Sequence, residues 1–428
     1  MRDTESWGRF IRSAPARVVE QEWTSTPLPS DDLLLPYGMG RSYGDVCLNN
    51  GHTLLSTTPL ARLRHLDEAN GLLVCEAGVT LDDLLDVIVP RGWFVPVTPG
   101  TKFVTVGGCI ANDVHGKNHH RAGSFGNHVR ALELVRSDRS SIRCSEEENR
   151  ELFHATIGGL GLTGMIVTAE IALRRIASAA MVVEQIPFQS LSEFDALSRE
   201  SDASHEYTVA WLDAFGGSRS RGIFFRGNHA PDRGASPSRR EPRRAPLALF
   251  SPLLTTAAVR AFNRLYFRAN SRPQPHRVDY DPFFYPLDRV ANWNAIYGRR
   301  GFVQYQCVVP DEAGLDPIAE ILDSAATSRT PSFLAVIKKF GPIRSAGMMS
   351  FPRAGTTLCL DFPGDRENLL PLLDRFDDVV ERAGGSVYPA KDARMPGARF
   401  RRFFPQWEAF RSYVDPRFSS SFWRRVTE

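Results

Sequence analysis

Glycine clusters beside short β-like runs dominate the N-terminal part of this chain and limit the folds open to it. Glycine permits positive φ, and without Cβ the backbone N–H groups of a loop can converge on an anion. Several such clusters in one region predict that several backbone segments approach one extended ligand, such as a dinucleotide. The clusters lie at residues 38–44, 96–101, 106–118 and 158–164.

The first cluster, GMGRSYGD at residues 38–45, differs from the two common phosphate-binding loops. Its spacing is not GxGxxG, which disfavours a Rossmann pyrophosphate turn. It also lacks the GK[ST] ending of the P-loop that binds nucleoside triphosphates. Taken alone, these glycines are explained by a tight β-turn, and it is the number of clusters that favours ligand binding.

The order of local patterns predicts two successive folding units. The N-terminal part alternates strands, glycine turns and helices, which is typical of an α/β or α+β domain. One helix is expected to begin at the N-cap Thr80 and to stop at Pro90-Arg91-Gly92. After about residue 175 the pattern changes to a second sheet. The expected strands are 72–76, 131–135, 165–173, 301–310, 333–341 and 356–363, with helices over 151–157 and 366–384.

Residues 217–245 contain many Arg, Ser, Gly and Pro and few large apolar side chains, which predicts a mobile loop. The arginines are densest at 233–244, and the next residues, 246–267, are apolar with interspersed arginines. This arrangement is typical of contact with anionic lipid head groups, and a solvated loop followed by a core helix is the alternative.

The composition restricts the class of protein. With 428 residues the chain is longer than one hydrophobic core usually supports, so two domains are expected. A hydrophobic content of 42% is typical of a globular protein, and a net charge of +3 is too small to indicate nucleic-acid binding. Six scattered cysteines without a CxxC pair argue against a disulfide framework and a zinc site. Without an apolar leader or a long apolar run, the expected location is cytoplasmic, with membrane-surface association left open.

Two further chemistries are disfavoured by the residues. His115 and His119 are four residues apart and would share one face of a helix, which leaves metal binding as an alternative. Gly116 and Asn118 are poor helix formers, and no carboxylate or cysteine lies at a familiar spacing, so no metal site is predicted. No GxSxG motif is present, which disfavours an α/β-hydrolase.

Eight motifs in a fixed order cover nearly the whole chain. In the N-terminal part they are GMGRSYGD (38–45), TPGTKFVTVGGCIAN (98–112), HGKNHHRAGSFG (115–126) and GGLGLTG (158–164). The later ones are 301–310, FLAVIKKFGP (333–342), CLDFP (359–363) and YPAKD (388–392). Together they resemble the vanillyl-alcohol-oxidase superfamily of flavoenzymes, and within it the decaprenylphosphoryl-β-D-ribose 2-oxidases.

The resemblance implies an α+β, two-domain fold of the vanillyl-alcohol-oxidase type. It implies an FAD-binding domain over residues 1–178, completed by 386–428, and a substrate-binding domain with an antiparallel sheet over 179–385. Some members link FAD covalently through a histidine, but Arg41 occupies the matching position here, so non-covalent FAD is expected. The residues expected to contact FAD are Gly38, Met39, Gly40, Arg41, Ser42, Tyr43, Gly100, Thr101, Val104, Gly107, Gly108, Asn112, His115, Gly116, Gly164, Ile166, Tyr388 and Ala390.

The resemblance also implies roles for residues at the reacting centre. Lys391 is expected to stabilise negative charge beside the flavin and to bind the substrate hydroxyl, whereas its local sequence alone suggests a surface lysine paired with Asp392. Tyr43 and His115 are the candidates for proton handling, with packing against FAD as the alternative for both. The residues expected to line the substrate pocket are Lys338, Gln304, Gln306, Cys359 and Tyr285.

The implied activity is FAD-dependent oxidation of the C2 hydroxyl of a polyprenylphosphoryl-β-D-ribofuranose to the 2-keto sugar. This would be the first half of an epimerisation to the arabinose form, for the arabinan of the cell wall, with a separate NAD(P)H-dependent reductase as partner. One alternative is an oxidase of soluble alditols or aldonolactones. The other is a flavin-binding component of a cell-envelope assembly without catalytic activity.

Overall fold

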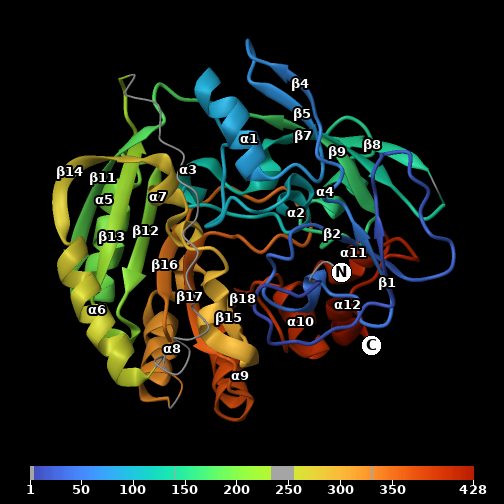
Figure 1. The fold of residues 1–428 in the computed structure, drawn as a ribbon. Helices are drawn as coiled ribbons and strands as arrows, with labels where there is room; N and C mark the ends of the chain where they lie inside the picture. Colours follow the sequence, from blue (N-terminus) through green and yellow to red (C-terminus); the bar gives the residue numbers. More distant parts are fainter. Residues whose placement is uncertain (1–3, 139, 233–254, 329, 331) are drawn as a thin grey trace.

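The computed structural model describes residues 4–138, 140–232, 255–328, 330 and 332–428 (Figure 1). The N-terminal part contains a three-stranded parallel sheet in the order β1-β3-β2 and a five-stranded antiparallel sheet in the order β4-β5-β9-β7-β8. The first sheet comprises β1 (Arg17–Glu20), β2 (Leu34–Tyr37) and β3 (Thr53–Ser56). The second comprises β4 (Leu63–Asp67), β5 (Leu72–Glu76), β7 (Val129–Val135), β8 (Ser141–Ser145) and β9 (Met165–Ala172).

Short helices join these strands, and two begin at threonine caps. Thr80 caps α1 (Leu81–Ile88) by accepting a hydrogen bond from the Asp83 N–H, which confirms the predicted helix start. Thr105 caps α2 (Val106–Ala111) in the same way. The remaining elements are α3 (His119–Ala122), α4 (Arg150–Thr156) and the strand pair β6 (Trp93–Phe94) and β10 (Arg174–Arg175).

An eight-stranded antiparallel sheet forms the second part of the molecule, in the order β14-β11-β13-β12-β16-β17-β15-β18. Together with the N-terminal sheets and helices, it gives the α+β fold of the vanillyl-alcohol-oxidase type that the resemblance implies. Its strands are β11 (Ala180–Phe188), β12 (Tyr207–Leu212), β13 (Gly222–His229), β14 (Arg272–Asp279), β15 (Phe302–Val309), β16 (Ala335–Phe340), β17 (Gly355–Pro363) and β18 (Ser386–Val387).

Helices cover one face of the eight-stranded sheet and bury a large apolar core against it. They are α5 (Leu191–Ser201), α8 (Asp316–Thr327) and α9 (Arg366–Arg382). Successive residues of a strand point to opposite sides of the sheet, so every second side chain lies on the face that these three helices do not cover. Register places Gln306 and Val336 on either side of Cys359, so these three side chains share that second face.

Two helices lie near the second face of the sheet. Helix α6 (Thr256–Asn270) runs along the outer flank, where Figure 1 shows it in yellow. Helix α7 (Tyr280–Phe284) follows β14. No helix of the described residues is long and apolar enough to cross a lipid bilayer.

The C-terminal residues return to the N-terminal sheets as α10 (Gly397–Phe403), α11 (Trp407–Arg411) and α12 (Ser421–Thr427). The predicted domain division, 1–178 with 386–428 against 179–385, stays a prediction. The strands of the large sheet begin at Ala180, but its edge strand β18 falls within the residues predicted to complete the FAD domain.

The prediction of a mobile loop over 217–245 is wrong for its first part. Residues 222–229 form strand β13, which pairs with β11 on one side and β12 on the other. Ile223 and Phe224 of this strand are buried, so tertiary packing outweighs the polar composition of the wider window. The arginine-rich residues 233–244 lie outside the described residues.

Candidate active site

A cavity of about 820 Å³ runs between the N-terminal glycine loops and the second face of the eight-stranded sheet. It brings together segments that are far apart in the sequence. All eighteen residues predicted to contact FAD line it, as do the predicted catalytic residues Lys391, His115 and Tyr43. Of the predicted substrate residues, the structure places these four on its wall: Lys338, Gln304, Gln306 and Cys359.

Tyr285 is the exception among the predicted site residues. It does not line the cavity, and its side chain is fully buried. Its hydroxyl lies 2.7 Å from the hydroxyl of Thr98, which does line the cavity. The expected contact of Tyr285 with substrate is therefore replaced by support of the cavity wall from behind.

The first glycine loop presents a row of free backbone donors to the cavity. Within the described part of the chain, the N–H groups of residues 39–42 donate to no protein acceptor. The loop is also closely packed, because a Cβ on Gly38 would lie 2.5 Å from Thr105 Oγ1 and Gly40 has a φ of +62°. Consecutive unpaired amides in a loop that tolerates no added Cβ fit the pyrophosphate of a dinucleotide.

The same loop anchors the segment that carries Lys391. The N–H of Tyr43 donates to the Ala390 carbonyl at 2.8 Å. A Cβ on Gly44 would lie only 1.5 Å from the Asp392 carbonyl oxygen, so glycine is required there. Arg425 of α12 completes the junction by donating to the carboxylates of Asp45 at 2.7 Å and Asp392 at 2.8 Å.

Lys391 points into the cavity rather than toward Asp392. Its Nζ lies 3.5 Å from the centre of the Tyr43 ring, a cation–π contact, while Asp392 is occupied by Arg425. Desolvation by the surrounding protein lowers the pKa of Lys391, and the nearby Cys359 and Asp361 oppose that change. The result is a cation held at low dielectric, where it interacts strongly with any developing negative charge.

Strands β15, β16 and β17 supply the polar end of the cavity. Gln304 and Gln306 are nearly fully buried on β15. Lys338 of β16 donates to the Gly116 carbonyl at 3.2 Å, and burial lowers its pKa to about 8. Burial raises the pKa of the Cys359 thiol to about 12, so Cys359 is a neutral wall residue at physiological pH.

His115 is a neutral imidazole in this arrangement. Burial lowers its pKa well below the usual range, with the cations Lys338 and Lys391 acting in the same direction. Its Nε2 lies 2.9 Å from Gln306 Nε2, so with this amide assignment Nε2 accepts and Nδ1 carries the proton. Nδ1 is buried and has no partner within the described residues, as expected for a donor that faces a ligand.

Asp361, which was not predicted from the sequence, lies directly beside the site but does not line the cavity. It is fully buried on β17, opposite Gln304, which donates to its Oδ1 at 2.5 Å. Its Oδ2 has no partner among the residues described. Burial raises the pKa of Asp361, and the charge of Lys391 opposes that shift. Asp361 belongs to the CLDFP motif (359–363), but the motif by itself assigns no role to this carboxylate.

Lys117 was not predicted either. It lines the cavity, donates to the Phe283 carbonyl and lies 4.5 Å from the centre of the Phe283 ring. Burial lowers its pKa to about 7, and the charge of Lys338 acts in the same direction. The cavity therefore holds three lysines, which favours an anionic ligand.

The other end of the cavity is apolar. It is formed by the same face of strands β11 to β14 and by the inner side of α6. An aromatic contact joins these two walls, because the Tyr266 ring of α6 lies 4.8 Å from the Trp211 ring of β12. Within α6, the Tyr266 ring also lies 5.8 Å from that of Phe262. The residues at this end include Val183, Val209, Trp211, Phe225, Val278, Phe262 and Tyr266.

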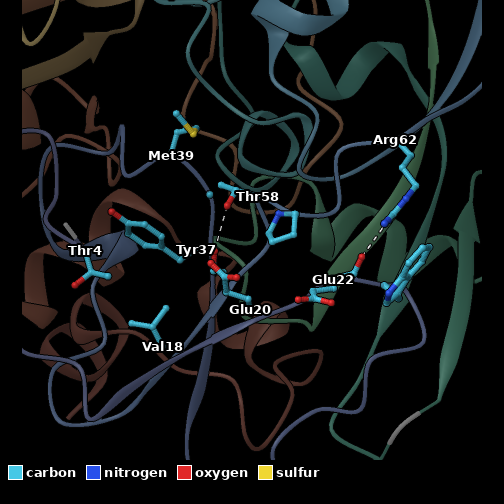
Figure 2. A pocket seen from close by; sticks show the side chains of 12 residues that line it. Thr4, Val18, Glu20, Glu22, Tyr37, Met39, Thr58 and Arg62 are labelled. Carbon is cyan, nitrogen blue, oxygen red and sulfur yellow. Dashed lines mark hydrogen bonds between the residues drawn. The ribbon is translucent and has the colours of Figure 1, made fainter. Parts of the chain in front are cut away.

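A second pocket, of about 700 Å³, opens beside the first glycine loop (Figure 2). It lies at the carboxyl ends of the three parallel strands, where Glu20, Tyr37 and Ser56 are the last strand residues. Figure 2 shows Arg62 reaching toward Glu22, whose carbonyl it contacts at 3.0 Å. This pocket shares Gly38 and Met39 with the cavity but contains none of the predicted catalytic residues.

Comparison with a family model identifies residues 30–145 as an FAD binding domain. The match contains the glycine loop with its row of free amides and the segments that form the adjoining cavity wall. FAD therefore fits the residues present, and it is the cofactor of this chain.

Comparison with individual proteins extends the similarity over the whole chain. The decaprenylphosphoryl-beta-D-ribose oxidase of Mycolicibacterium smegmatis is 36% identical, and the alignment covers 98% of this chain and 96% of that protein. An uncharacterized protein of Streptomyces coelicolor is 32% identical over 81% of this chain and its own full length. The delta(24)-sterol reductase of Macaca fascicularis is 32% identical, but over only 36% of this chain and 30% of its own.

Proposed function

Because the chain belongs to the decaprenylphosphoryl-β-D-ribose oxidase family of FAD-dependent oxidoreductases, we propose that it oxidises the C2 hydroxyl of a polyprenylphosphoryl-β-D-ribofuranose to the 2-keto sugar. The observation that carries this proposal is the division of one cavity into a cationic end and an apolar end. A sugar phosphate with a polyprenyl tail has the same two halves. An oxidase of soluble alditols or aldonolactones would leave the apolar end without a ligand.

Bound FAD would supply the acceptor for the hydride that leaves C2 of the sugar, and the proton of the C2 hydroxyl would be released to water. Lys391 binds the C2 oxygen through Nζ–H and stabilises the negative charge that develops beside it. His115 donates from Nδ1, which orients the ligand at the ring, while Gln306 fixes the imidazole through Nε2. Lys338 and Lys117 contribute positive charge that suits the phosphate.

The partner enzyme follows from the chemistry of the product. A 2-keto sugar becomes the arabinose form only if hydride returns to the opposite face of C2. We therefore assign that step to a separate NAD(P)H-dependent reductase and the pair to synthesis of cell-wall arabinan. In a coupled assay, arabinose product should form only when both enzymes and a reduced nicotinamide are present.

Membrane contact is part of the proposal, since the substrate carries a lipid tail. The basic loop 233–244 that suggested such contact lies outside the described residues, but α6 belongs to the segment that followed it. Support comes from the arginines of α6 and its exposed apolar side chains.

The position of oxidation can be tested with deuterium. Anaerobic mixing of the FAD-loaded protein with a short-chain prenylphosphoryl ribose should bleach the flavin absorbance. Deuterium at C2 should slow this step by a primary isotope effect, and deuterium at C3 should leave the rate nearly unchanged. Bleaching that is slowed only by C3 deuterium would assign the reaction to another hydroxyl and refute oxidation at C2.

A further inference from the structure

Helix α6 exposes two different faces beside the one that packs on the protein. Only Val259 and Asn263 of its fifteen residues are buried. Arg260, Arg264 and Arg268 recur every fourth residue and form one stripe, because each residue advances about 100° around the helix. The helix contains no acidic residue.

An apolar strip lies between the arginine stripe and the cavity. By the same helical spacing, Leu265 follows the arginines around the helix, and Phe262 comes next. Leu265 is 67% exposed and Phe262 is 46% exposed, and among the described residues after Arg175 they are the two exposed large hydrophobic side chains. An amphipathic helix with arginines beside exposed leucine and phenylalanine is the composition of a helix that lies in a membrane interface.

The cavity reaches the surface at this strip. Phe262, Tyr266 and Asn270 line the cavity from α6, and the Phe262 ring is at the same time half-exposed to solvent. Its ring stacks on that of Phe333, another wall residue, at 5.9 Å. The apolar end of the cavity therefore opens beside the exposed apolar side chains of α6.

We propose that α6 docks the protein on an anionic lipid bilayer and forms the entrance through which the polyprenyl tail enters the cavity. The arginine stripe contacts the head groups, and Leu265 and Phe262 enter the interface. The lipid-entrance half of this inference rests on the proposed polyprenyl substrate, whereas the docking half rests on α6 itself.

Charge distinguishes a bilayer from other occupants of this surface. Within the described residues, neither Arg264 nor Arg268 forms an ion pair with a carboxylate. The other exposed apolar group, Val18, Trp23 and Met39, surrounds the pocket of Figure 2. That pocket contains Glu20 and Glu22 as well as Arg62, so its charge is mixed, whereas α6 itself contains arginines and no acidic residue.

The docking half is tested by sedimentation of the full-length, FAD-loaded protein with lipid vesicles. The protein should bind vesicles that contain phosphatidylglycerol, bind phosphatidylcholine vesicles weakly, and dissociate at high salt. The Arg264→Glu/Arg268→Glu variant should weaken binding at least about tenfold, since each basic residue near an anionic surface contributes about a fivefold change.

Leu265→Glu should also weaken binding about tenfold or more. Leu63→Glu is the matched control, because Leu63 is an exposed leucine of β4 at 37% exposure, and this variant should bind like the wild type. Equal binding of Leu265→Glu and wild type, or no preference for anionic vesicles, would overturn the docking proposal. A dimer that forms without vesicles and is lost in Leu265→Glu would assign the surface to a second copy of the chain instead.

The entrance half is tested with two substrates. Leu265→Glu should oxidise a water-soluble short-chain prenylphosphoryl ribose at the wild-type rate but a long-chain substrate in vesicles at least about tenfold more slowly. If Leu265→Glu oxidises both substrates more slowly by the same factor, or oxidises both at the wild-type rate, the proposed entrance is wrong. If neither substrate is oxidised by the wild type while vesicle binding persists, the proposed function fails and docking stands.

Discussion

The Nζ of Lys391 lies 3.5 Å from the centre of the Tyr43 ring, which joins a residue near the carboxyl end of the chain to the first glycine loop. The contact places a partly buried cation against the loop that offers free amides to the dinucleotide. Backbone packing between Gly44 and Asp392, with Arg425 across both segments, fixes the geometry of this pair. The position of Lys391 therefore depends on the same loop that fits the pyrophosphate.

Replacing Lys391 by alanine should reduce turnover about 10²-fold or more, because one preorganised charge at the reacting centre is removed. Bound FAD should be largely retained, as measured by the ratio of flavin to protein absorbance. Lys391→Arg should restore little activity, since the planar guanidinium places its donors differently. Lys339→Ala is the control, because Lys339 does not line the cavity and pairs with Asp195 and Asp311. Turnover of Lys391→Ala near that of the control would remove Lys391 from the mechanism.

The pH dependence of kcat/KM should show a fall on the alkaline side near pH 8. Burial lowers the pKa of Lys338 to about 8 and also lowers that of Lys391. Both lysines are cations below their pKa, so their charge is present at lower pH and is lost as the pH rises. A profile that stays flat well above this pH would show that neither charge is needed.

Asp361→Asn should move that alkaline fall to lower pH. The negative charge of Asp361 raises the pKa of Lys391, so its removal makes the ammonium easier to deprotonate. Asp374→Asn, which alters an exposed carboxylate of α9, should leave the profile unchanged. A fall at the wild-type pH in Asp361→Asn would indicate that Asp361 only supports the packing of Gln304.

FAD should be released on denaturation. Arg41 occupies the position at which a covalent histidine is found in some relatives, and its Nε donates to the Phe103 carbonyl at 3.1 Å. Acid precipitation should therefore give a colourless pellet and a yellow supernatant. A pellet that keeps the flavin colour would establish a covalent bond to another residue.

Gly44→Ala should destabilise the protein by about 2–3 kcal/mol, because its Cβ would overlap the Asp392 carbonyl. The displaced segment carries Lys391, so activity should fall together with stability. Gly216→Ala is the control, since its nearest neighbour would lie 3.5 Å away and the change should stay within about 0.5 kcal/mol. Urea unfolding followed by flavin fluorescence measures the stability of both variants. Equal unfolding midpoints for Gly44→Ala and Gly216→Ala would contradict the packing argument.

Backbone-determined features of the site could be predicted from the sequence. The absence of a Cβ is a property of the residue itself, so the glycine clusters indicated the loops that line the cavity. Gln304 and Gln306 also alternate with Val303 and Tyr305, a local pattern that predicts one shared face of a strand, and both glutamines line the cavity from β15.

Features that depend on partners distant in the sequence could not be predicted. Asp361 becomes significant only through the register of β17 against β15. Tyr285 lies behind Thr98 rather than in the cavity because of how α7 and the residues after it pack, which no local pattern encodes. Strand β13 was not predicted because the polar composition of residues 217–245 indicated a loop. The strand is stabilised by pairing with β11 on one side and β12 on the other.

Oxidation of the sugar by bound flavin can be measured by anaerobic titration of the FAD-loaded protein with a short-chain prenylphosphoryl-β-D-ribofuranose while the flavin absorbance is followed. One equivalent of sugar should bleach one equivalent of flavin and yield the 2-keto sugar, whereas the same phosphate with a 2-deoxyribose should leave the absorbance unchanged. Protein that binds FAD but keeps its full absorbance with the ribose substrate would contradict the proposed oxidation.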